Sequence, residues 1–222
     1  MLHKTRGIVF RFTKYGETSI IVNIFTELFG LGSYIVNGVR SKSGQGKIAL
    51  YQPLTLVDLV VYHRENANIN RIKEIKCLHQ YQTVQSDIRK TAIGIFLSEV
   101  VNKTIKEESH ASELCAFMVK SFVTLDTITT NVENFHLIFL LKLCRLLGFG
   151  VDQASEVVGI RATNSSNEKA INDLITTNYT DTLSLTNNQR REILELVLHF
   201  YDDHLGSLGE WKSIPVLREV LA

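Results

Sequence analysis

The sequence predicts an α+β protein of two domains: an N-terminal five-stranded β-barrel of the OB type, followed by an all-α helical domain. Two observations support this class. The first 80 residues carry short β-forming runs separated by turns, and a helical spacing of apolar residues begins near Asp87 and recurs to the end of the chain. Strands that precede all helices favour separate domains over alternating βα units. We therefore expect domains at residues 1–80 and 81–222, with the boundary near 79–86.

Five strands are expected in the first domain. Turn signals rich in glycine and polar residues separate them at residues 14–17, 29–32, 41–46 and 64–68. The strands are expected at residues 5–12, 18–26, 33–39, 54–63 and 69–77. Five short strands in a segment of this size are typical of a small barrel, and the OB fold is the natural candidate.

The second domain opens with an amphipathic helix that has Asp87 as its expected N-cap. Apolar residues on one face of this helix follow helical spacing, and they are Ile88, Ala92, Ile95, Phe96 and Val100. Further helices are expected at residues 111–125 and 168–176. The segment at 132–147 is apolar on nearly every side and is expected to be central and buried.

Local signals fix several helix ends in the second domain. Gly148 suits the C-terminal cap of the central helix. Thr186 and Gln189 form a capping box at the start of the next long helix, and Gly206 closes that helix. Pro215 suits the first turn of a last helix that ends near residue 221.

The composition bounds the environment of the protein. The N-terminal sequence lacks the pattern of a secretory signal, and no segment reaches the roughly 20 apolar residues of a membrane span. Three widely spaced cysteines, Cys77, Cys115 and Cys144, indicate neither a disulfide framework nor a thiolate zinc site. All three are expected to be small core residues in a reducing compartment, so we expect a cytoplasmic protein without a membrane partner.

The net charge of +1 conceals an asymmetry between the domains. Residues 1–80 hold 11 Lys and Arg against 5 Asp and Glu, whereas residues 81–222 hold 13 against 18. A basic N-terminal part indicates a polyanionic partner such as nucleic acid. The alternative is that an excess of six positive charges is ordinary for a small solvated domain, and composition alone does not decide between them.

A basic loop at residues 38–47 is the first candidate phosphate site. It carries Arg40, Lys42 and Lys47 together with three glycines, which would let the backbone approach a phosphate. It is not a P-loop, because Ser41 and Ile48 stand where that motif needs glycine and a hydroxyl residue. The alternative is a solvated loop without a ligand.

Further cations lie on the predicted strands and turns. Arg71 and Lys73 are two residues apart and should share a face of the fifth strand. The first strand and the turn after it add three more, namely Arg6, Arg11 and Lys14. Cations that meet phosphates beside rings that stack on bases would form a platform for single-stranded nucleic acid.

The aromatic residues of the first domain have two possible roles, because a ring is either a stacking surface or part of the barrel core. We assign Phe10, Phe25 and Tyr62 to the core. The sequence leaves the other rings undecided, and these are Tyr15, Tyr34 and Tyr51.

No motif indicates an enzyme or a cofactor. His199 and Asp203 lie four residues apart on one helix face, but a third metal ligand at suitable spacing is missing. The polar face of an amphipathic helix explains this pair better. No nucleophile motif is present, so we expect no catalytic residues and no metal.

In residues 4–44 (KTRGIVFRFTKYGETSIIVNIFTELFGLGSYIVNGVRSKSG), 139–152 and 199–221, the chain resembles the bacterial DNA repair protein RecO family. Residues 4–44 match the first strand, the KYGE turn, the FT-E-FG-L hairpin and the G-V-R-S loop of that family. Residues 139–152 (FLLKLCRLLGFGVD) resemble its central buried helix, and residues 199–221 resemble its C-terminal helices. The resemblance spans nearly the whole chain and is weakest at 81–130 and 153–185.

The resemblance implies a recombination mediator with an OB barrel, a helical domain and no catalytic turnover. Such a protein binds single- and double-stranded DNA, anneals complementary strands and helps load the recombinase onto protein-coated gaps. The implied partners are RecR and the C-terminal tail of the single-stranded-DNA-binding protein, and the implied location is the nucleoid. By position, the residues that match the family's DNA-facing charge are Arg6, Arg11, Lys14, Arg40, Lys42 and Lys47.

One departure from the family concerns zinc. Many members carry four zinc-binding cysteines after the L-G-F-G segment, but residues 153–170 contain neither cysteine nor histidine. We therefore expect no zinc site and a degenerate zinc-ribbon-like region or loop near 153–185. In the helical domain, the cations proposed for the partner's tail are Lys142, Arg145 and Lys212. The alternative function is a protein–protein adaptor with little direct DNA contact.

Overall fold

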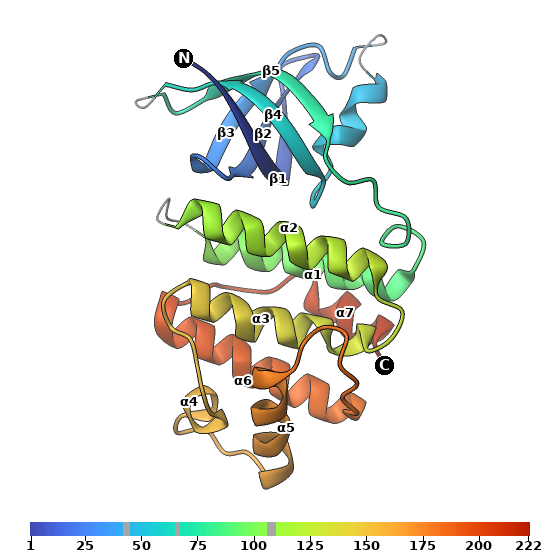
Figure 1. Ribbon diagram of the computed structural model, residues 1–222, viewed down its shortest axis with the longest axis vertical. Coiled ribbons are helices and arrows are strands. Elements are labelled where there is room, and N and C mark those ends of the chain that lie inside the picture. Colours follow the sequence, from blue (N-terminus) through green and yellow to red (C-terminus); the bar gives the residue numbers. More distant parts are fainter. Residues whose placement is uncertain (42–44, 65–66, 106–109) are drawn as a thin grey trace. The chain divides into compact units, whose positions relative to one another are not determined.

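A computed structural model of the chain describes residues 1–41, 45–64, 67–105 and 110–222 (Figure 1). The chain divides into two compact units. The barrel unit comprises residues 1–81 and 105–123, and the helical unit comprises residues 82–104 and 124–222. The segment at 105–123, which the sequence groups with the helices, therefore clusters with the barrel.

The barrel unit is built on a closed five-stranded barrel in the order β1-β2-β3-β5-β4 (Figure 1). Only the β3–β5 pair is parallel, through Tyr34–Asn70 and Ile35–Arg71. A short 3₁₀ helix, η1 (Gln45–Tyr51), lies between β3 and β4 in the chain. The strands are β1 (Leu2–Tyr15), β2 (Ser19–Thr26), β3 (Gly30–Val36), β4 (Leu56–Tyr62) and β5 (Asn70–Cys77). The predicted fold class is confirmed.

Strand β1 closes the barrel by pairing with two neighbours. Its N-terminal half pairs with β4 and its C-terminal half with β2. The register with β2 shifts between Val9 and Arg11, so Phe10 is the extra residue of a β-bulge. Gly7 lies where the strands approach closely, because a Cβ there would be 2.8 Å from Ile24 Cγ2 and 2.9 Å from the carbonyl oxygen of Phe25. A bulge and a glycine at the point of closure are the usual means of bending a strand around a barrel.

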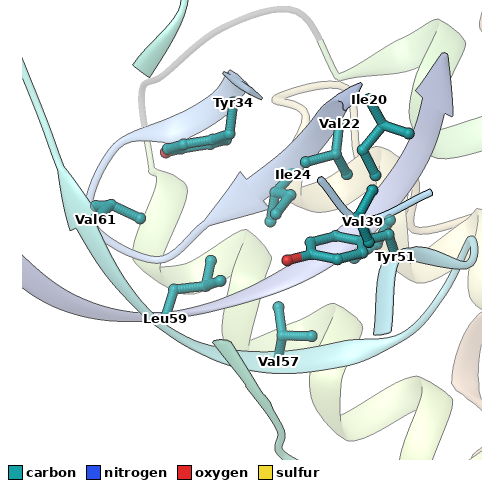
Figure 2. Packing of buried hydrophobic residues seen from close by; sticks show 10 residues of the cluster. Ile20, Val22, Ile24, Tyr34, Val39, Tyr51, Val57, Leu59 and Val61 are labelled. Carbon is teal, nitrogen blue, oxygen red and sulfur yellow. The ribbon is translucent and has the colours of Figure 1, made fainter. Parts of the chain in front are cut away.

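Several aromatic residues of the first domain belong to the core of the barrel. Phe10 and Phe25 are buried, as predicted. Tyr34 and Tyr51 are buried as well, and Figure 2 shows them together with Val39 and apolar side chains of β2 and β4. The assignment of Tyr62 to the core is wrong, since 46% of it is exposed.

Three local predictions in the barrel unit are corrected. Lys14 lies within β1 rather than in a turn, because β1 extends to Tyr15. Lys47 lies in η1 rather than at the end of a loop. Cys77 is exposed at the end of β5, whereas Cys115 and Cys144 are buried as expected.

The helical unit contains most of the helices, and α2 contributes to both units. They are α1 (Ile88–Thr104), α2 (Ala111–Thr127), η2 (Val132–Asn134), α3 (Phe135–Leu146), α4 (Ala154–Val158), α5 (Ser165–Thr176), α6 (Asn187–Leu205) and α7 (Ile214–Val220). Residues 153–185 contain two helices in place of the expected ribbon or loop; α5 confirms the helix expected at 168–176, and α4 was not predicted. Among the described residues, no helix is both long and apolar enough to cross a membrane.

The predicted helix ends are reproduced. Asp87 caps α1, since its Oδ1 accepts the backbone N–H of Arg89 at 2.9 Å. The capping box of Thr186 and Gln189 is present at the start of α6. Gly148 has φ +90° after α3, where an L-residue with a Cβ would be strained.

The buried face of α1 differs from the predicted stripe. Ile88 and Ile95 are 69% and 53% exposed, whereas the cation of Lys90 is buried. The Lys90 ammonium donates to Thr83 Oγ1 at 2.6 Å and to the Asp126 carbonyl at 2.7 Å. The Asp126 carboxylate also accepts the backbone N–H groups of three consecutive residues, 82–84. These charge-assisted bonds offset the desolvation of Lys90 and hold the segment before α1.

Replacing Gly7 by alanine is expected to destabilise the protein. The new Cβ meets the backbone of Phe25, which cannot move without shifting the barrel. Overpacking of this kind typically costs about 1–3 kcal/mol of the free energy of unfolding. Urea denaturation followed by circular dichroism measures the change. Gly46→Ala is the control, because nothing lies within 4 Å of a Cβ there; equal stability of both variants would contradict the prediction.

Candidate nucleic-acid interface

A row of outward-facing residues crosses the barrel from β4 to β1. Register pairs Tyr62 with Arg71, Arg71 with Ile35, Ile35 with Ile21, and Ile21 with Thr13. Neighbouring strands lie about 4.8 Å apart, so the row from Arg71 to Thr13 spans roughly 14 Å. OB barrels bind oligonucleotides on the face of strands 2 and 3 and on the loops beside it. This row crosses that face.

A cleft of about 580 Å³ lies at the β4–β5 end of the row. It is lined by Met1, Tyr62, Arg64, Ala67, Ile69, Asn70 and Arg71. The backbone N–H of Arg64 donates to the side chain of buried Asn70 at 3.0 Å, which fixes the start of the connection. The cleft thus combines an exposed phenol ring with two guanidinium groups.

The other end of the row lies at the β1–β2 turn. Arg40 is held there by two bonds: its backbone N–H donates to the Thr18 carbonyl at 2.9 Å, and its Nη1 donates to the Gly16 carbonyl at 3.1 Å. Lys14 is exposed near the end of β1, where it alternates with Thr13 and pairs with buried Ile20, so it stands at the rim of the barrel beside the turn. Positive charge therefore stands at both ends of the OB face.

Arg6 stands apart from these cations. Its guanidinium makes a bidentate pair with Glu27, with Nη2–Oε1 at 2.6 Å and Nε–Oε2 at 3.0 Å. The hydrogen bond and charge of Arg6 hold the pKa of Glu27 below its usual value. Eight residues of strand, roughly 26 Å, separate Arg6 from Lys14. The structure does not bring the basic residues of β1 into one patch.

The remaining predicted DNA-binding residues are dispersed over the barrel. Arg11 is exposed opposite Asn23 of β2. Lys47 is exposed on η1, and Lys73 is exposed at a bulge in β5 with its ammonium 4.0 Å from Glu74. Lys42 lies outside the described residues.

Several cations of the barrel unit have no acidic partner among the described residues. Arg11, Lys14, Arg40, Lys47, Arg64 and Arg71 form no ion pair in the described part of the chain. By contrast, Arg6, Arg89 and Arg161 are each bound to carboxylates. An unpaired surface cation can bind a phosphate without first breaking a bond to an acid.

Sequence reasoning missed Tyr62 and Arg64. The exposure of Tyr62 could have been predicted from Asp58, because a charged residue on β4 is expected to face outward. Because side chains alternate along a strand, positions 60 and 62 then face outward too. Arg64 carried no comparable signal, since a single arginine in a turn is ordinary surface.

The three cations proposed for the partner's tail occupy different settings in the helical unit. Arg145 of α3 donates to the Val151 carbonyl at 2.9 Å and to Asp152 at 2.7 Å, so it braces the turn after α3. Lys212 precedes α7, and its backbone N–H donates to Glu99 at 3.0 Å. Lys142 lies on α3, half-buried. The described contacts do not join Arg145 and Lys212 into one cluster.

A small slot in the helical unit gathers other arginines. It is lined by His136, Asn187, Arg190, Arg191, Leu194, Leu217, Arg218 and Leu221, and it has room for about one water-sized group, 20 Å³. The Nε atoms of Arg190 and Arg218 are buried there without a hydrogen-bond partner among the described residues. Burial lowers the pKa of Arg190, and burial with the nearby Arg190 charge lowers the pKa of His136 to about 3. We call this site the arginine slot.

The pair His199 and Asp203 has another explanation than metal binding. Both oxygens of Asp203 accept from the guanidinium of Arg161, at 2.7 and 2.9 Å. The carboxylate is therefore engaged in an ion pair on the surface of the helical unit.

A closed OB barrel with unpaired cations beside its binding face, joined to a helical unit, defines a nucleic-acid-binding protein. Comparison with known families refines this class. Residues 1–81 match the model of the recombination protein O N-terminal domain, and residues 85–168 match that of its C-terminal domain. The chain belongs to the RecO family of DNA repair and recombination proteins.

Relatives support the same assignment along the full chain. The DNA repair protein RecO of Bacteroides fragilis is 33% identical, with 99% of each chain covered. Those of Christiangramia forsetii and Flavobacterium psychrophilum are 31% and 30% identical, also over 99% of each chain. The predicted family is confirmed, and nothing in these similarities indicates catalytic activity.

Replacing Arg64 and Arg71 by alanine is expected to weaken binding of single-stranded DNA. Each lost phosphate contact should make the slope of log affinity against log salt shallower by about 0.7. Fluorescence anisotropy of a labelled oligonucleotide at several salt concentrations measures the slope. Arg6→Ala is the matched control, because Glu27 already occupies that guanidinium; an equal loss in the Arg6 variant would contradict this interpretation.

Proposed function

We propose that the barrel binds single- and double-stranded DNA through its phosphates. The observation that carries the proposal is the set of unpaired cations at both ends of the OB face, with Lys14 and Arg40 at one end and Arg64 and Arg71 at the other. Phosphate contacts carry no sequence information, so binding should depend steeply on salt and little on sequence. Four such contacts give a salt slope of about −3 on a single strand.

Annealing follows from the same charges. Two complementary strands repel each other until cations neutralise their phosphates. The further cations Lys47 and Lys73 lie on η1 and at the bulge of β5, outside the row that joins Arg71 to Thr13. They provide contacts for a second strand while the first occupies the OB face. In the cell, this activity would help load the recombinase onto protein-coated gaps at the nucleoid.

The proposed protein partners are RecR and the tail of the single-stranded-DNA-binding protein. For the tail, Lys142, Arg145 and Lys212 remain proposed contacts. The arginine slot is a competing contact for the terminal carboxylate alone, because it has room for about one water-sized group and two of its guanidinium nitrogens lack a partner in the described chain. Cations at the rim of the slot would bind the carboxylate, while the rest of the peptide would lie on the surface outside it.

The adaptor function is the second candidate. The observation in its favour is that the helical unit offers the arginine slot while Arg6 on the barrel is occupied by Glu27. In an adaptor, the barrel cations would be solvated and without a ligand.

Replacing Arg40, Lys42 and Lys47 together by alanine separates the two functions. A DNA-binding mediator should lose affinity for single-stranded DNA, show a shallower salt slope and anneal complementary oligonucleotides more slowly. Anisotropy titration and a fluorescence-quenching annealing assay measure these effects. Unchanged affinity and annealing, with wild-type circular dichroism, would favour the adaptor.

Replacing Arg191 by alanine tests the location of the tail. Arg191 lines the slot and is exposed, so its loss should spare the fold while weakening a labelled tail peptide about tenfold. Anisotropy of the peptide reports the change. Arg145→Ala is the comparison: a larger loss in that variant would place the tail at the Arg145 site instead.

A further inference from the structure

Exposed apolar side chains gather around the cleft at the β4–β5 connection. Tyr62 and Ile69 line the cleft and are 46% and 44% exposed, and Met1 is also exposed there. Leu2, the register partner of Tyr62 on β1, is 44% exposed. Apolar surface left in water at one place on a barrel indicates a ligand that covers it.

Two arginines beside this apolar surface indicate that the ligand also carries a negative charge. Arg71 is the other register partner of Tyr62, and Arg64 lines the same cleft two residues after the ring. Neither guanidinium forms an ion pair among the described residues. A ligand that satisfies both features carries a flat apolar group and an anion close together. A nucleotide unit does so, with its base and its phosphate.

The size of the cleft and its exposed ring suit an unpaired base. Its volume of about 580 Å³ falls within the usual range for small-molecule sites, about 300–1,000 Å³. In a duplex both faces of each base are covered by neighbouring bases, so a ring such as Tyr62 has nothing to stack on. An unpaired base can leave the strand and enter the cleft.

We propose that this cleft holds one unstacked base of a single strand, with Tyr62 stacked on the base and Arg64 and Arg71 on the adjoining phosphates. This inference rests on the proposed DNA binding and adds a site for one base to it. The cleft selects unpaired DNA, whereas the other cations of the barrel accept single strands and duplexes alike.

The test compares Tyr62→Ala, Tyr62→Phe and wild-type protein on two oligonucleotides of equal length. One is oligothymidine, and the other is an abasic strand that keeps the phosphates but lacks bases. Wild-type protein should bind oligothymidine more tightly than the abasic strand. Tyr62→Ala should lose roughly 5- to 150-fold of affinity for oligothymidine, the effect of one lost stack. Tyr62→Phe, which keeps the ring, should restore the affinity to within about twofold.

Two further measurements complete the test. The affinity of Tyr62→Ala for the abasic strand and for duplex DNA should equal that of wild-type protein, because no base reaches the cleft. Tyr15→Ala is the matched control, since it removes an exposed ring at the end of β1. It should preserve the preference for oligothymidine.

The outcomes separate this inference from the proposed function. Wild-type protein that binds no DNA at low salt would overturn the proposed DNA binding. Salt-dependent DNA binding that Tyr62→Ala leaves unchanged would overturn the base-binding cleft alone, and would assign the apolar surface to a protein partner. Equal losses in Tyr62→Ala and Tyr15→Ala would also overturn it, because the cleft would then have no special role.

Discussion

Closure of the barrel by β1 is the constraint on which the OB face depends. One strand of 14 residues pairs with β4 in its first half and with β2 in its second half. It bends between them through the bulge at Phe10 and the close approach at Gly7. Because side chains alternate along each strand, this register decides which residues face solvent. A slip by one residue would bury Arg71 and expose the core.

The distribution of ion pairs gives the surface its functional pattern. Arg6 on the barrel and several cations of the helical unit, such as Arg89 and Arg161, are bound to carboxylates distant in the chain. Arg11, Arg64 and Arg71 of the barrel form no ion pair among the described residues, although the protein as a whole is nearly neutral. Affinity for a polyanion thus depends on the local absence of acidic side chains near the cations. The net charge of the protein gives little indication of that affinity.

Several features were predictable because their causes are local. The capping box of Thr186 and Gln189, the N-cap Asp87 and the glycine after α3 each act within a few residues of chain. The α1 stripe was predicted only in part. The spacing of apolar residues predicts that Ile88 and Ile95 are buried, but both are exposed. The buried face of α1 includes Lys90 instead, because Thr83 and Asp126 from other segments bind its ammonium.

The sequence by itself determined the order of strands and helices, the OB class of the barrel and the family, since propensity, turn chemistry and motif order reside in short stretches of chain. Tertiary structure alone decided which charges and rings are available. Arg6 is neutralised by Glu27, 21 residues away, and Arg71 joins Tyr62 and Ile35 only through the register of three strands. Pairing between distant segments depends on the closed barrel, and no local pattern encodes it.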